Sequence, residues 1–148
     1  MSWKNILKQS KYPKEMNKNM FSYDEQKIKN YAKKLLKEKF PLKRGKEYVQ
    51  MLEDYKKGDS FKLGEITFKI DEVDMRYDDW LSVYGIEGDM FFNNQNLGLW
   101  GVDLEPEKYK EEDKLVHSIS LHYGDGYPIN SDADIELYSA YYELENKI

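Results

Sequence analysis

The alternation of apolar and polar residues is clearest in the stretch GDSFKLGEITFKI, residues 58–70. Gly64-Glu65 fits a two-residue hairpin loop, because glycine supplies the positive φ that such a turn needs. This turn sets three pairs of opposite residues: Leu63 with Ile66, Phe61 with Phe68 and Asp59 with Ile70. The apolar residues then share one face, and a slip of one residue would turn them all to water. We predict a half-buried hairpin whose apolar face another part of the chain covers.

Two amphipathic helices are predicted before the hairpin. The first runs from about Tyr23 to Lys39, with Ser22 as N-cap and Glu25 completing a capping box. Its apolar positions follow the spacing of a helix face: Ile28, Tyr31, Ala32, Leu35 and Leu36. The second helix spans about 44–57 and ends before Gly58, where a helix-terminating glycine is typical.

The residues after the hairpin predict an antiparallel sheet. The parity of the apolar positions breaks after Ile70, which indicates a bulge or a strand end at Asp71-Glu72. The other expected elements are a polar turn over 76–79, a strand over 80–86, a turn over 87–89, an apolar run over 90–92, a loop over 93–96, a strand over 97–104, a polar connector from 105 and a strand over 114–123.

The last element, about 132–147, is predicted to be a helix with Ser131 as its cap. Its apolar stripe consists of Leu137, Tyr141, Leu144 and Ile148, with Tyr138 beside it. A strand is the alternative, although its parity would place polar and apolar residues on both faces. The fold class is therefore α+β: two N-terminal helices packed on a meandering antiparallel sheet of about 5–6 strands, with a C-terminal helix.

Length and composition fit one globular domain over 1–148, with residues 1–21 as a basic and mobile arm. The 15% aromatic content argues against intrinsic disorder. No apolar run approaches the roughly 18 residues of a membrane span, and the N-terminus lacks the apolar core of a signal peptide. The absence of cysteine excludes a thiol nucleophile and fits a reducing compartment, so we expect a cytoplasmic protein without membrane contact.

The net charge of −5 hides a division between the two parts of the chain. Residues 1–57 have sixteen Lys and Arg against seven Asp and Glu, whereas residues 58–148 have seven against twenty-one. Such asymmetry is typical of a nucleic-acid-binding arm or of an acidic interaction face. Two solvated surfaces that attract one another within one fold are the simpler explanation of this division.

His117 and His122 are the candidates for acid–base chemistry. They are five residues apart, so a straight strand places them on opposite faces and they cannot form one unit. The stretch 125–136, DGYPINSDADIE, spaces its oxygens like a calcium loop, but Ile135 occupies the position that needs glycine. Nucleotide-binding, lipase and zinc-protease motifs do not occur, so no metal or cofactor is expected.

The segment MFFNNQNLGLW, residues 90–100, is the best candidate for an exposed recognition surface. Aromatic residues beside an amide-rich loop are typical of interface hot spots and stacking platforms. The candidate partner-binding residues are Phe91, Phe92, Asn93, Asn94, Asn96 and Trp100. The alternative is that the aromatic residues fill the core and the asparagines form a turn.

We expect a non-enzymatic protein–protein interaction module whose acidic C-terminal half contacts a protein partner. The first alternative is nucleic-acid binding by the lysine-rich arm and the first helix, through Lys8, Lys11, Lys29, Lys33 and Lys37. The second alternative is a small hydrolytic enzyme that uses His117 or His122 with a nearby carboxylate. The Lys, Asn, Ile and Tyr bias is typical of AT-rich microbial or viral genomes.

Overall fold

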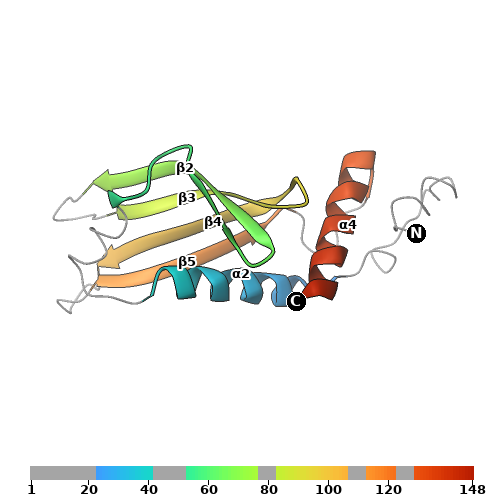
Figure 1. Ribbon diagram of the computed structural model, residues 1–148, viewed down its shortest axis with the longest axis horizontal. Helices are drawn as coiled ribbons and strands as arrows, with labels where there is room; N and C mark the ends of the chain where they lie inside the picture. The colour runs from blue at the N-terminus through green and yellow to red at the C-terminus, as the bar shows by residue number, and fades with distance from the viewer. Residues whose placement is uncertain (1–22, 42–52, 77–82, 107–112, 123–128) are drawn as a thin grey trace, which may run out of the picture.

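The computed structural model describes residues 23–41, 53–76, 83–106, 113–122 and 129–148 (Figure 1). Five strands form one antiparallel sheet in sequence order, which confirms the predicted meander and the α+β class. The elements are α2 (Glu25–Lys39), β1 (Ser60–Leu63), β2 (Ile66–Arg76), β3 (Val83–Phe92), β4 (Gln95–Pro106), β5 (Asp113–Leu121) and α4 (Asp132–Lys147). Neither α2 nor α4 combines the length and apolar character that crossing a lipid bilayer requires, a finding that covers the described residues.

The prediction of two N-terminal helices is not matched, because one described helix precedes the sheet and the other follows it. Most of the second predicted helix, 44–52, lies outside the described residues. Its predicted end is wrong, since residues 55–57 are not helical. The polar turn was predicted over 76–79, but Arg76 belongs to β2, and 77–79 lie outside the described residues. Residues 107–112 of the predicted connector also lie outside them.

Helix α2 begins two residues later than predicted. Its N-cap is Asp24, whose carboxylate accepts a hydrogen bond from the Lys27 amide, so the assignment of Ser22 as cap was wrong. Ser22 and Asp24 are both suitable N-cap residues, and the general N-cap preferences do not separate Ser from Asp. The predicted apolar stripe is confirmed: Ile28, Ala32 and Leu36 are buried, and Tyr31 and Leu35 pack against the core.

The β1–β2 hairpin has the predicted register, with Phe61 opposite Phe68 and Leu63 opposite Ile66. Gly64 has a φ of +53° and lies against the hydroxyl of Tyr31, so this position needs both the glycine conformation and the absence of a side chain. Ile66, Phe68 and Ile70 of β2 are fully buried, and Lys62 on the other face is exposed.

The predicted bulge is confirmed, because the pairing of β2 with β3 shifts register between Ile70 and Glu72. The predicted turn over 87–89 is wrong: β3 runs through these residues without a break. Gly88 belongs to the bulge, since a Cβ there would lie 1.8 Å from the backbone oxygen of Lys69. A glycine inside a strand marks such a close approach of two backbones as readily as it marks a turn.

The loop predicted over 93–96 is shorter than expected. Asn93 and Asn94 both have positive φ, 49° and 64°, which is the conformation of a two-residue hairpin turn. Asparagine tolerates this region of backbone space better than other non-glycine residues. Strand β4 therefore begins at Gln95 and extends through Glu105-Pro106, where a connector was predicted.

The C-terminal elements are confirmed. In β5, Leu115 and Leu121 lie on the buried face, whereas Ser118 and Ser120 are exposed. Helix α4 begins at its predicted cap, Ser131, whose hydroxyl accepts a hydrogen bond from the Asp134 amide. The predicted stripe of α4 is buried or half-buried: Leu137, Tyr138, Tyr141, Leu144 and Ile148.

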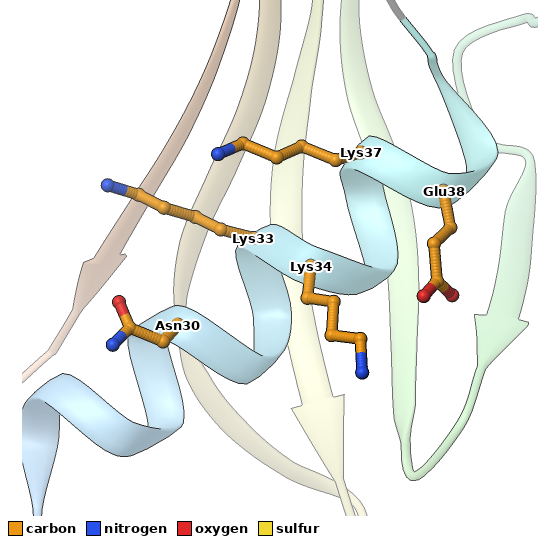
Figure 2. Close-up of a pocket in the computed structure, with 5 residues that line it drawn as sticks. All are labelled: Asn30, Lys33, Lys34, Lys37 and Glu38. Atoms are coloured by element: carbon orange, nitrogen blue, oxygen red, sulfur yellow. The ribbon is translucent and has the colours of Figure 1, made fainter.

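The core lies between one face of the sheet, which we call the inner face, and the two helices. Figure 2 shows α2 crossing in front of the strands, and the hairpin β1–β2 bends toward it in Figure 1. The inner face is defined by buried side chains of three central strands: Ile66, Phe68, Ile70, Ile86, Met90, Trp100 and Val102. The sheet therefore has a second, outer face that neither described helix covers.

Truncating the hairpin core should unfold the protein without a selective effect on binding. Phe68→Ala removes a fully buried ring that contacts Phe61 and Trp100, so we expect a loss of about 3–5 kcal/mol in the free energy of unfolding. Lys62→Ala, on the exposed face of the same hairpin, should change it by less than about 0.5 kcal/mol. Urea unfolding followed by tryptophan fluorescence measures both, and two similar losses would contradict the assigned register.

The second stability prediction concerns two glycines of the sheet. Gly88→Ala drives a methyl group into the backbone at Lys69 and should cost at least about 2 kcal/mol. In Gly101→Ala the nearest atom is the movable hydroxyl of Ser118, at 2.9 Å, so the cost should be smaller. Thermal unfolding of both variants checks this order, and the reverse order would mean that the bulge does not constrain residue 88.

Candidate functional site

The outward side of α2 is the most cationic surface in the described residues. Helix α2 contains six lysines, at positions 27, 29, 33, 34, 37 and 39. Lys29 pairs with Glu25 at 3.2 Å, and the Lys27 ammonium donates to the backbone oxygen of Glu145 at 3.1 Å. The Lys39 ammonium lies over the ring of Phe61, 4.8 Å from its centroid. Three of the six lysines therefore have partners within the chain.

The remaining lysines, Lys33, Lys34 and Lys37, surround a shallow hollow on the surface of α2 (Figure 2). We call this the α2 hollow; its lining residues are Asn30, Lys33, Lys34, Lys37 and Glu38. None of the three lysines forms an ion pair with another described residue. Figure 2 shows Lys33 and Lys37 extending to the same side of the helix, as expected for residues one turn apart.

Asn30 adds a neutral hydrogen-bond donor to the α2 hollow. Its side-chain oxygen accepts a hydrogen bond of 2.7 Å from the amide of Gln26, one turn earlier. This bond uses the acceptor end of the Asn30 amide and leaves the two N–H groups of its nitrogen to donate. The α2 hollow thus offers three ammonium groups and one amide donor, with the carboxylate of Glu38 as its single acidic group.

The outer face of the sheet is acidic. Residues that alternate with the buried ones place five carboxylates there: Asp71, Glu72, Glu87, Asp89 and Asp103. Lys62 and Lys69 are the lysines among the outer-face residues described on β1 and β2. Leu99 lies on this face in β4, next to the edge strand, and is 53% exposed, between Asp89 of β3 and Ser120 of β5.

Two of these carboxyl groups interact directly at the bulge. A hydrogen bond between the side chains of Asp71 and Asp89 raises the pKa of Asp71, with smaller contributions from burial and from repulsion by the Asp89 charge. The nearby Lys69 ammonium partly offsets the rise. Asp71 therefore keeps its proton to a higher pH than an isolated aspartate does.

The two histidines are separated, as their spacing predicts. The ring of His117 is half-buried on the inner side and its Nε2 lies 2.9 Å from the Phe40 oxygen, at the end of α2. His122 is exposed beyond the end of β5, and its Nε2 lies 2.9 Å from the side-chain oxygen of Asn96. Neither histidine lines the α2 hollow. Their geometry gives the hydrolase hypothesis no support.

Most residues of the predicted partner surface over 91–100 are buried or make hydrogen bonds within the chain. Trp100 and Phe92 are buried, 2% and 3% exposed. Asn93 donates to the carboxylate of Glu143 in α4 at 3.1 Å, and the oxygen of Asn96 accepts from the Gly98 amide. Phe91 is half-buried on the outer face and Asn94 is exposed at the hairpin turn. These contacts agree with the core-packing alternative for the two buried aromatic residues.

The acidic residues of the stretch 125–136 that are described lie at the N-terminus of α4. The carboxylate of Asp134 accepts a hydrogen bond from the Asn130 amide, and Asp132 lies in the first turn. Both favour the positive end of the helix dipole. The described residues contain no group of three His, Asp or Glu side chains placed to hold a metal ion.

Of the predicted nucleic-acid-binding lysines, the structure brings Lys33 and Lys37 together, while Lys29 pairs with Glu25. Lys8 and Lys11 lie outside the described residues. The prediction did not include Asn30, Lys34 and Glu38, although their helical spacing places them beside Lys33 and Lys37. The outer-face carboxylates could not be grouped without the strand pairing, because they come from three different strands.

A comparison with protein-family models, curated proteins and solved structures finds no match to this chain.

The half-buried His117 predicts a pH dependence of stability. Burial lowers its pKa below the ordinary value of 6.5; the hydrogen bond to the Phe40 oxygen offsets this in part, and the charge of Lys37 adds to the lowering. The folded protein therefore binds a proton at His117 less readily than the unfolded chain does. The neutral ring contributes to stability above about pH 6.5, and this contribution is lost as the pH falls through the lowered pKa.

Urea unfolding at pH 7.5 and at pH 5.5 measures this loss. His117→Gln keeps a donor for the Phe40 oxygen but cannot take a proton, so its loss between the two pH values should be smaller than that of the wild type. His122→Gln is the matched control and should retain the wild-type loss. Equal losses in all three proteins would rule out His117 as the origin.

Proposed function

We propose that the protein is a non-enzymatic binding module that contacts a protein partner through the outer face of its sheet. The observation that supports this most is Leu99, an apolar side chain 53% exposed on the acidic outer face, with a strand on either side of it. Interfaces between proteins typically combine an apolar centre with a polar rim. The outer face has this arrangement on a small scale.

The backbone of the outer face suits a flat contact. Gly101 lies beside Ser118, and Leu99 lies beside Ser120, so the side chains next to the exposed leucine on its β5 side are small. The half-buried ring of Phe91 extends the apolar part toward Thr67 of β2. Neither described helix covers these residues, because the apolar stripe of α2 packs on the inner face and α4 contacts the end of the sheet at Asn93, Gln95 and Leu97.

The charge of the outer face indicates the chemistry of the partner. Among the outer-face residues whose side chains are described, five carboxylates stand against Lys62 and Lys69, and Lys57 pairs with Glu72 at 3.7 Å. The cross-strand neighbours Glu72 and Glu87 have the same sign. Like charges directly opposite one another destabilise a sheet. A partner with Lys or Arg side chains around an apolar centre would relieve this repulsion and would associate faster through electrostatic steering.

Site-specific photo-cross-linking in the native host tests this proposal. A photoreactive residue at position 99 should form a discrete protein adduct, whereas the same residue at position 34, exposed on α2, should not. The double variant Glu87→Lys/Asp89→Lys should abolish the adduct from position 99 while retaining the circular dichroism of the folded protein. No adduct from position 99, or the same adduct from both positions, would refute the outer face as the interface.

A further inference from the structure

We propose that the α2 hollow binds the phosphate backbone of double-stranded nucleic acid without reading its sequence. This inference concerns a different face of the molecule and does not depend on the proposed protein partner. Helix α2 packs its apolar stripe on the inner face of the sheet, so the α2 hollow points away from the sheet.

The six lysines of α2 differ in whether another group of the chain contacts their ammonium. Glu25, the Glu145 backbone oxygen and the ring of Phe61 account for three lysines. The other three lysines share one hollow with the donor end of Asn30 and have no ion-pair partner among the described residues. A polyanion lying along the α2 hollow would meet these four donors over about two turns of helix.

The helix dipole does not explain this arrangement. Cations near the C-terminus of a helix are favourable, which accounts for Lys37 and Lys39 in the last turn. Lys33 and Lys34 lie in the middle of α2, where the dipole gives no such support. Lys33 and Lys37 are one turn apart, and like charges at this spacing destabilise a helix. A bound polyanion turns this repulsion into attraction.

The lining of the α2 hollow favours a nucleic acid over an acidic protein. Protein interfaces depend on aromatic or large apolar anchors, and every residue that lines the α2 hollow is polar or charged. Phosphate recognition needs no such anchor, because lysine acts on phosphate as a point charge. The absence of an aromatic ring in the lining also disfavours single strands, which bind by stacking bases on aromatic side chains. A duplex backbone is therefore the occupant that fits.

Fluorescence anisotropy with a labelled 20-base-pair DNA duplex tests the proposal between 10 and 100 mM salt. Each phosphate contact contributes about −0.9 to the slope of log K against log salt, so three lysine contacts predict a slope of about −2.7. The double variant Lys33→Gln/Lys37→Gln should reduce the slope to about −0.9 and weaken binding at least tenfold at 50 mM salt. Glu38→Gln, which removes the carboxylate of the α2 hollow, should strengthen binding.

Lys62→Gln/Lys69→Gln is the matched control, because it removes the same two charges from the outer face and leaves α2 intact. We expect it to keep the wild-type slope. Equal weakening by both double variants would show that binding follows net charge, and no effect of Lys33→Gln/Lys37→Gln would place the contact elsewhere in the chain. Either outcome overturns the proposal.

Two competitors distinguish the duplex from other anions. Inorganic phosphate at the same charge concentration should displace the duplex weakly, because it cannot engage three lysines along the helix at once. Poly-L-glutamate should also compete poorly. If poly-L-glutamate displaces the duplex as effectively as unlabelled DNA does, the α2 hollow is a site for an acidic protein segment and the nucleic-acid assignment fails.

Discussion

The indole N–H of Trp100 lies at the point where the sheet departs from regular pairing. The bulge at Asp71 interrupts the ladder between β2 and β3, and it brings the backbone of Lys69 against Gly88. The Trp100 nitrogen lies 3.1 Å from the backbone oxygens of both Lys69 and Asp89, and donates to them. Its ring packs edge-on against Phe61 and Phe68. One buried side chain thus satisfies polar groups that the irregular pairing would otherwise leave without a donor.

The bulge also determines how the two ends of the sheet meet the helices. Bulges increase the local twist of a strand and bend it. The hairpin tip contacts α2, where the Glu65 amide donates to the Tyr31 hydroxyl at 3.0 Å. This contact closes the core on one side and leaves the opposite side of α2 in solvent. The acidic outer face and the basic α2 hollow are therefore separated by the thickness of the core, so two ligands can occupy them together.

Local chemistry made part of this structure predictable from sequence. The hairpin register, the bulge and the C-terminal helix depend on apolar parity, turn glycine and a capping serine, all of which are short-range signals. Gly88 was misassigned to a turn because glycine is required there by the Lys69 backbone, which lies nineteen residues away in another strand. Burial of Trp100 is likewise a property of the assembled sheet. For the candidate site, helical spacing gave Lys33 and Lys37, but the partner of Lys27 comes from α4, which no local pattern reveals.

The two described helices meet although most of the sequence separates them. The ring of Tyr23, just before α2, stacks on Tyr141 of α4 with centroids 4.5 Å apart, and the Tyr141 hydroxyl donates to the Leu97 oxygen in β4. Helix α2 precedes α4 in the chain, so during synthesis the apolar stripe of α2 is made before the helix that shares its core. Closure of this core therefore depends on residues 132–147, the later of the two helices.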